Sequence, residues 1–309
     1  MFKNARVYRV HQDAISAAEL HDCLLKMKFK NAGPFEARRI GFSSAAGKDA
    51  PEMILSISGM HLVKFTEQVK ILPSSVVKER VQEECDNIEG TTGMPPTRKE
   101  RQAIKEQIVE LLLPQAFYKT DHTFLIWDTN KNLIIIDASS EKKATSALDA
   151  LRMSIGSLKV TPFAVREPIS RTITGWLTEP SKRELDITIG DRVQLRGNDD
   201  GVIAARYMDL DSNEIQAALS EGRRVSKMSI HIEGQMSCML HEDFTIKQIA
   251  FDDALIDEVN DQSKDQVSSI DSELAIFGSS LSESIIRLAN ALGGEQEAAV
   301  ATSFTLEQE

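Results

Sequence analysis

The chain has 309 residues, 41% hydrophobic and 27% charged, which is enough to bury a sizeable core in two or three domains. It has no apolar run of bilayer length, no apolar signal-peptide core in MFKNARVYRVHQD, and only three widely spaced cysteines, so we expect a cytoplasmic protein without a disulfide framework. The net charge of −11 is uneven: residues 240–309 hold 15 acidic and 3 basic residues, which leaves 32 acidic and 33 basic residues before them, so a basic surface is compatible with the first three quarters.

The first 72 residues alternate between strand and helix patterns. The elements predicted in order are a strand at 2–10, a helix at 13–28 capped by Asp13, an irregular stretch at 35–51, and strands at 52–58 and 61–69. Gly59 occupies the turn between the last two strands.

A charged helical hairpin over residues 73–114 then interrupts the strands, and we refer to it as the arm. Pro73 begins its first helix, and glycines and prolines at 90–96 prevent one continuous helix. Thr97 and Glu100 form a capping box for the second helix, which Pro114 ends. The apolar stripes are narrow: Val77, Val81, Cys85 and Ile88 in the first helix, and Ile104, Ile108 and Leu111 in the second. Because such narrow stripes bury little apolar surface, we expect the arm to project from a core and to meet a partner.

The strand and helix patterns resume after the arm. Strands at 122–128 and 132–138 flank a hairpin turn, Ser139 or Ser140 caps a helix that runs through Ser154, and residues 160–165 predict another strand. The segments on either side of the arm thus resemble two similar α+β halves.

The remaining residues predict a second module and a long last helix. A short helix at 170–180 precedes short strands between Arg183 and Phe251, with one more helix capped by Asp211 or Ser212 and a turn at Glu233–Gly234. From Ser263 to Leu292, apolar residues recur at helical spacing: Val267, Ile270, Leu274, Phe277, Leu281, Ile285, Leu288 and Leu292.

We therefore predict an α+β fold with four parts. These are a base domain (1–72 with 115–170), the arm (73–114), a second α+β module (171–251), and an acidic C-terminal helix and tail (252–309).

Sequence motifs for catalysis or cofactor binding are weak. GFSSAAGKD (41–49) has five residues between its glycines and an Asp after Lys48, so it does not match a phosphate-binding P-loop. The six histidines show no metal-ligand spacing. Asp128 and Asp137 follow apolar strands and could hold a nuclease metal, although turn chemistry is the simpler explanation. We expect no cofactor, no metal and no catalytic residue.

Basic residues are the main candidates for ligand contacts. They are Arg38, Arg39, Lys78, Arg80, Arg98, Lys99, Arg101, Lys105, Arg206, Arg223, Arg224 and Lys227. Because no sequence-reading motif accompanies them, any nucleic acid would be held through its backbone.

Several long motifs resemble the RdgC family of recombination-associated bacterial proteins. They are FKNARVYR, ILPSSVVK, LLLPQAF, WDTNKNLIIIDASSEKKA, LRMSIGSL, GVIAARYMDLDSNEI and the C-terminal GGE, and the match is collinear over essentially the whole chain. The resemblance implies a homodimer closed into a ring around duplex DNA, bound without sequence preference. It also implies association with the nucleoid, restraint of RecA-promoted strand exchange, and no enzymatic activity; single-stranded DNA is a second partner that it leaves open.

The resemblance also assigns roles to individual residues. It implies a ring-closing contact for Phe117 and DNA contacts for Arg206, while Tyr207 and Met208 stand where relatives carry more polar or basic residues. The predicted DNA-binding residues are Arg206, Arg223, Arg224, Lys227, Lys78, Lys99 and Arg101. The arm mixes acidic and basic residues, so we expect it to serve assembly with few phosphate contacts.

Two alternatives from other classes stay open. One is a metal-dependent nuclease built on Asp128, Asp137 or other carboxylates. The other is a protein-interaction scaffold that acts through the C-terminal stripe and binds little DNA.

Overall fold

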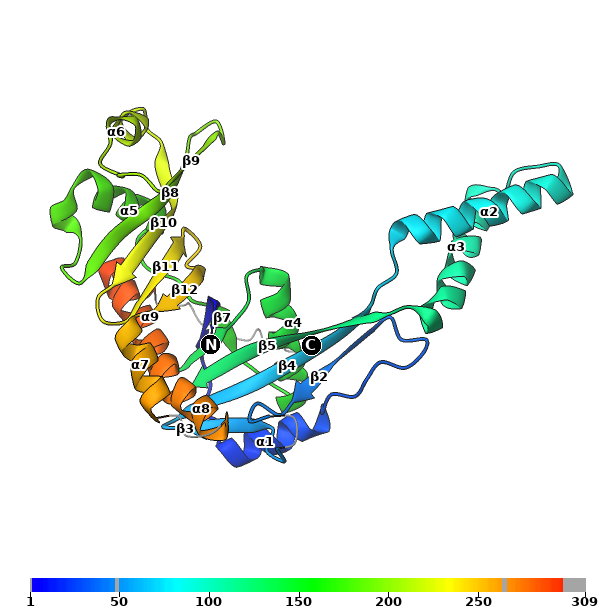
Figure 1. Ribbon diagram of the computed structural model, residues 1–309, viewed down its shortest axis with the longest axis horizontal. Coiled ribbons are helices and arrows are strands. Elements are labelled where there is room, and N and C mark those ends of the chain that lie inside the picture. The colour runs from blue at the N-terminus through cyan, green and yellow to red at the C-terminus, as the bar shows by residue number, and fades with distance from the viewer. Residues whose placement is uncertain (1, 48–49, 263–265, 297–309) are drawn as a thin grey trace, which may run out of the picture.

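The chain forms a crescent with an α+β base and two limbs (Figure 1). The computed structural model describes residues 2–47, 50–262 and 266–296. One limb is the arm, and the other carries the strands that follow residue 186; both rise on the same side of the base and leave an open space between them. Within the described residues, no helix is long and apolar enough to cross a bilayer.

The base is a curved antiparallel sheet with helices on one face. Helices α1 (Ala17–Lys26) and α4 (Glu141–Ile155) bury Leu20, Leu24 and Leu148 against this face, whose largest buried side chain is Trp127. The strands of the base are β1 (Asn4–Val10), β2 (Arg38–Ser43), β3 (Ile54–Ile57), β4 (Met60–Lys70), β5 (Tyr118–Asp128), β6 (Leu133–Ile136) and β7 (Val160–Pro162). The hairpin predicted between β5 and β6 is confirmed.

Several predictions in the base differ from the structure, and two of the differences have a clear physical cause. The first helix begins four residues after Asp13, because the Ser16 hydroxyl accepts a hydrogen bond from the Glu19 backbone N–H and caps it. Residues 38–43, predicted irregular, form β2, because all six pair with β4. Gly41 is required there, since a Cβ would lie 2.7 Å from the Phe29 Cα and the Met27 carbonyl oxygen.

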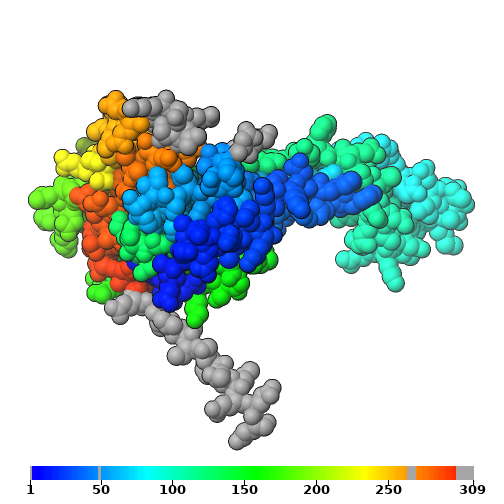
Figure 2. All heavy atoms as spheres, turned by 90° about the horizontal axis from the view of Figure 1, so that it is seen from below, coloured from blue at the N-terminus to red at the C-terminus, as the bar shows by residue number. Residues whose placement is uncertain are grey.

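The arm is confirmed as two helices, α2 (Ser74–Thr92) and α3 (Arg98–Leu112), followed by a short 3-10 turn at Leu113–Gln115. At about 1.5 Å per residue, α2 is roughly 28 Å long, and it projects well beyond the body of the molecule (Figures 1 and 2). Gly93 ends α2 in the left-handed conformation, and the Thr97–Glu100 capping box begins α3.

A small core of its own holds the two arm helices together. Val77, Val81, Cys85 and Ile104 are buried in it, with Ile108, Val109 and Leu112 packed against them. Leu111, predicted in the apolar stripe, is instead exposed, because Leu112 completes the inward face.

The second limb contains five strands and two helices. They are α5 (Ile169–Thr178), a 3-10 turn (Pro180–Lys182), β8 (Ile187–Arg196), β9 (Val202–Arg206), α6 (Asn213–Ser220), β10 (Arg224–Ile232), β11 (Met236–His241) and β12 (Ile246–Phe251). Within the predicted run of short strands, residues 187–196 form one ten-residue strand, β8, because β10 pairs along most of its length.

Strand β1 joins the limb to the base. Its residues Arg6–Arg9 pair with β6 along one edge. On the other edge, Asn4 and Ala5 pair with β12, whereas Tyr8, Arg9 and Val10 pair with β7. The described residues consequently form one twelve-stranded sheet along the path β2-β4-β5-β6-β1-β12-β11-β10-β8-β9, with β3 beside β4 and β7 beside β1.

The C-terminal helices pack over this joint. They are α7 (Asp253–Gln262), α8 (Gln266–Glu273), a π-helical turn (Leu274–Gly278) and α9 (Ser279–Ala291). The predicted helix over 263–292 thus extends through residues 266–291 and includes a π-helical turn, where Gly278 packs close to Met60 and Ile126. Its apolar stripe from Leu274 to Leu292 is buried, whereas residues 263–265, the Val267 side chain and the tail from 297 lie outside the described residues.

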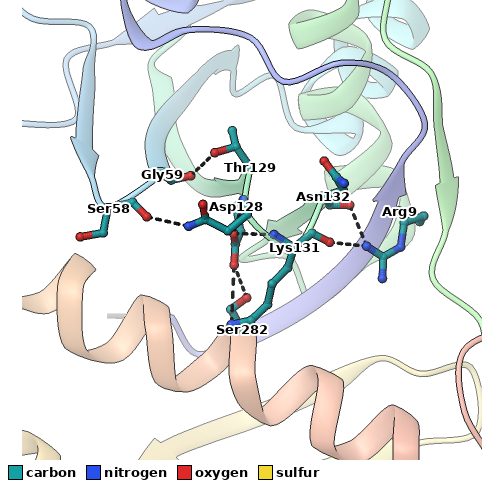
Figure 3. Close-up of polar contacts among 9 residues, drawn as sticks. Arg9, Ser58, Gly59, Asp128, Thr129, Lys131, Asn132 and Ser282 are labelled. Atoms are coloured by element: carbon teal, nitrogen blue, oxygen red, sulfur yellow. Dashed lines mark hydrogen bonds and ion pairs between the residues drawn. The ribbon is translucent and has the colours of Figure 1, made fainter.

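Helix α9 bonds to both sides of the joint. Its buried Ser282 hydroxyl donates to the Asp128 carboxylate at the end of β5 (Figure 3), while Ser280 donates to Gln235 and Arg287 pairs with Asp186 in the limb. Asp128 is only 2% exposed and also accepts hydrogen bonds from the backbone N–H groups of the following turn, at 2.9 and 3.0 Å.

We predict that Ser282→Ala lowers the free energy of unfolding by about 1–3 kcal/mol, because it leaves a buried carboxylate oxygen short of a donor. Urea denaturation measures this loss. Ser279→Ala, at an exposed position of the same helix, should change the unfolding free energy much less. Equal effects of the two substitutions would contradict the role given to the Ser282–Asp128 contact.

Candidate nucleic-acid interface

The sheet of the second limb is covered on one face only. Val193, Val225 and Met228 point to the face that packs on Ile173 and Trp176 of α5. Helices α5 and α6 lie on the outer side of the strands, away from the arm (Figure 1). Because side chains alternate along a strand, the intervening residues form an uncovered face on the side of the open space.

This uncovered face holds a groove lined mainly by basic and amide side chains, which we call the basic groove. It has a volume of about 460 Å³ and is lined by Arg192, Val193, Gln194, Ala204, Ala205, Arg206, Tyr207, Lys227, Met239, His241, Lys247 and Gln248. No carboxylate is among these lining residues. The groove therefore combines a small apolar floor with cations from four strands.

Two irregularities in the strands shape the groove. The β8–β10 register shifts beside Gly190, where a Cβ would lie 2.5 Å from the Ser229 hydroxyl, and that hydroxyl bonds to the backbone of Arg192. Strand β12 is irregular at Gln248, whose φ is +54°. Arg192 reaches across β10 and β11 and donates to the Gln248 side-chain oxygen at 2.5 Å. Bulges thus aim both side chains into the groove.

The cations of the groove are largely free of carboxylate partners. Across residues 2–47, 50–262 and 266–296, Arg206, Lys227 and Lys247 have no ion pair. The fourth cation, Arg192, has its Nε atom 3.7 Å from the Oδ1 atom of Asp191. Such side chains remain able to contact an anionic ligand.

His241 shows the effect of these charges. Its imidazole has a pKa lowered to about 4, first by burial and then by the positive charges of Lys247 and Lys227. Asp243 acts in the opposite direction, and Arg6 in the same direction as the lysines. At pH 7 the imidazole is therefore neutral, and the groove is positive through its arginines and lysines.

The predicted DNA-binding residues lie in separate places. Arg206 and Lys227 meet in the basic groove. Arg223 donates to the Gly201 carbonyl at 2.9 Å and so holds the β8–β9 turn, while Arg224 is exposed at the start of β10, opposite Arg196. These two residues do not line the groove.

The other three predicted residues belong to the arm, at the opposite end of the crescent (Figure 1). Lys78 and Arg101 line a shallow groove between α2 and α3, where Arg101 donates to Gln82 at 2.7 Å. Lys99 is exposed outside that groove, in the first turn of α3.

Sequence reasoning missed Arg192, His241 and Lys247. Arg192 and His241 alternate with buried residues at period two, in RVQLR and MSCMLH, and this pattern could have placed them on one sheet face. Lys247 lacks that signal, because the bulge at Gln248 breaks the alternation in IKQIAF. No local pattern in the sequence indicates the order of the strands, which brings β9 and β12 to one groove.

The candidate nuclease carboxylates are far apart. Asp128 pairs with Leu133, and Asp137 lies beside Phe124, so they stand at opposite ends of the β5–β6 hairpin, about 13 Å apart at 3.3 Å per residue. Asp137 accepts hydrogen bonds from the backbone and side chain of Asn4. In the described part of the chain, no three His, Cys, Asp or Glu residues cluster in a way that could hold a metal ion.

Comparisons with known proteins match almost the whole chain. A family model described as "Putative exonuclease, RdgC" matches residues 1–295. Proteins named "Recombination-associated protein RdgC" are similar throughout: that of Shewanella sp. (strain ANA-3) is 31% identical over 302 residues (96% of this chain, 98% of the relative). That of Tolumonas auensis is 32% identical over 299 residues, and that of Aeromonas hydrophila 33% over 300, each covering 96% of this chain and 99% of the relative.

We predict that the imidazole of His241 titrates with a pKa of about 4, and that Lys247→Met raises this pKa by removing a nearby positive charge. NMR titration of the histidine ring measures both values. Because the folded-state pKa lies below 6.5, the stabilising contribution of neutral His241 is present above pH 6.5 and is lost as the pH falls toward 4. The control, Lys182→Met at the outer turn after α5, should leave the pKa of His241 unchanged. A His241 pKa near 6.5 in the native protein would contradict the prediction.

Proposed function

Because this chain belongs to the RdgC family, we propose that it binds double-stranded DNA without reading its sequence and acts in recombination. The observation that carries this proposal is the convergence of Arg206, Lys227 and Lys247, none of them ion-paired within the described residues, in one groove. Phosphates are the anionic groups that DNA presents at regular spacing, and cations of this kind bind them whatever the base sequence.

The shape of the groove supports backbone contacts rather than base reading. Direct readout places a helix or a β-ribbon into the major groove of the duplex. Here the cations stand on the face of a sheet, where they can reach phosphates along the outside of a duplex. The acidic residues of α7 lie at the outer edge of the crescent, so repulsion would disfavour DNA on that side (Figure 1).

We propose further that two copies close into a ring, with DNA in the open space between the limbs. An exposed apolar surface at the base of the arm supports this assembly: Phe117 is 84% exposed, and Ile71 and Tyr118 beside it are also exposed. The Ile71 backbone N–H donates to the Phe117 carbonyl oxygen, so the segments that carry these side chains are held together. Such a surface on one copy is suited to burial by another.

By occupying duplex DNA, the ring would restrain strand exchange promoted by RecA and would associate with the nucleoid. Restraint by occupancy requires no direct contact with RecA and no catalytic step. It depends on retention of DNA, to which both the groove cations and closure of the ring contribute.

An exonuclease activity is the second candidate, because the matching family description names one. Asp128 and Asp137 are too far apart to share a metal ion, and each is engaged in hydrogen bonds that stabilise the fold. These geometries favour binding over metal-assisted hydrolysis by this carboxylate pair.

We predict that Lys227→Met weakens binding to unrelated duplexes to a similar extent and lowers the slope of log affinity against log salt by about 0.9, the value for one phosphate contact. Fluorescence anisotropy over a salt series measures both changes. Lys182→Met removes the same charge on the outer side of the limb and should leave the slope unchanged.

The same duplexes incubated with Mg²⁺ or Mn²⁺ separate binding from hydrolysis. We expect them to remain intact. Cleavage by the wild type that is lost in Asp137→Ala would contradict a function limited to binding, and a salt-independent affinity would contradict the phosphate contacts.

We predict that Phe117→Ala weakens self-association by about 30-fold or more, as removal of a central aromatic contact does at interfaces. The unfolding free energy of the monomer should change by less than about 0.5 kcal/mol, because the side chain is exposed in the single chain. Analytical ultracentrifugation and dilute-protein denaturation measure the two quantities. Met153→Ala, at an exposed site on α4, is the control; loss of monomer stability without loss of association would contradict the contact.

A further inference from the structure

The basic groove contains one large aromatic side chain, Tyr207, at the end of the edge strand β9. Its side chain is 84% exposed, although it stands among the lining residues of a groove. A tyrosine in this position offers a flat, rigid surface next to cations.

The backbone turns Tyr207 into the groove. In a regular strand, residue 207 would share the buried face of Ala205. Tyr207 instead has a φ of +56°, a conformation unfavourable for a bulky residue, and Met208 packs against the core. The side chain consequently lies on the same face as Arg206, rather than in the core.

The neighbours of Tyr207 leave room for a flat ring and supply polar groups. Ala204, beside Gln194 in the register of β8 and β9, has too small a side chain to fill the floor. Gln194 offers an amide donor and acceptor, and Arg192 lies opposite Arg206 in the same pairing. This part of the basic groove thus combines an exposed aromatic face, a shallow floor and cations that could contact phosphates.

We propose that Tyr207 stacks on an unpaired base, so that the basic groove holds a single-stranded segment by one stacking contact as well as by phosphate contacts. This inference rests on the proposed DNA binding and adds to it a contact residue, Tyr207, and a preferred form of the ligand, unpaired DNA. Stacking on an aromatic side chain tolerates every base, because each base has a π-face. In an intact duplex the base faces are covered by their neighbours, so the contact favours unpaired DNA.

A contact between two copies of the chain explains the exposure of the Tyr207 side chain less well. Around a two-fold axis, the same patch of each copy would meet the other, which would bring the cations of one groove close to those of the other. Like charges at such a contact are unfavourable. A polyanion that carries exposed aromatic rings satisfies both features of the groove.

The test compares variants of the full chain on a single-stranded oligonucleotide containing 2-aminopurine and on its duplex. Tyr207→Ala should weaken single-strand binding by about 5- to 150-fold, the range for one lost stacking contact, and should affect the duplex less. Tyr207→Phe keeps the ring and should bind as the wild type does. At saturating protein, the wild type and Tyr207→Phe should quench the fluorescence of 2-aminopurine, whereas Tyr207→Ala should not.

Two further variants separate stacking from other effects. Tyr207→Gly also removes the ring but accepts a positive φ without strain, so its loss of binding cannot be attributed to unfolding. Phe35→Ala removes an exposed aromatic side chain near the arm and should leave single-strand affinity unchanged. The salt slope of Tyr207→Ala should match the wild type, since no charge is lost.

The outcomes distinguish this inference from the proposed function. If the wild type binds neither DNA, the proposed function fails. If it binds both and Tyr207→Ala retains single-strand affinity or quenching, the stacking contact is overturned while DNA binding stands. A change in particle mass without a change in single-strand affinity would place Tyr207 between copies instead and would also overturn the inference.

Discussion

The pairing of β1 on both edges is the constraint on which the rest of the structure depends. A strand has only two edges, and β6 occupies one of them. The other edge is divided, with Asn4 and Ala5 bonded to β12 and Tyr8, Arg9 and Val10 bonded to β7. Only a short stretch of backbone hydrogen bonds thus connects the base sheet to the second limb. Because a junction this short could bend, the position of the limb requires further contacts.

The C-terminal segment supplies those contacts. Helix α9 bonds to Asp128 in the base and to Asp186 and Gln235 in the limb, and the π-helical turn before it stacks Phe277 on Phe251 with ring centroids 4.5 Å apart. A single hydrophobic cluster extends across the joint, from the base strands through the buried face of α9 to the limb strands. Burial of that cluster fixes the angle between base and limb, and so the width of the open space.

The basic groove follows from this arrangement in two steps. Helices α5 and α6 cover the outer face of the limb, so the opposite face keeps polar side chains and turns toward the open space. The bulges beside Gly190 and at Gln248 then bring Arg192, Lys247 and their neighbours into one groove. The arm differs from the limb: its charges are mixed in sign, and an exposed aromatic side chain, Phe117, stands at its base.

Local patterns in the sequence determined the elements whose causes are local. The Thr97–Glu100 capping box, the break between the two arm helices and the hairpin between β5 and β6 depend on residues within a few positions of each other, and all three were predicted. The long collinear motifs likewise indicated the family. Only the tertiary structure decided that residues 38–43 form a strand, that the last helix contains a π-helical turn before Ser279, and that Arg206 and Lys227 share a groove with Lys247. These features depend on hydrogen bonds and burial between segments distant in the chain, for which no local pattern carries a signal.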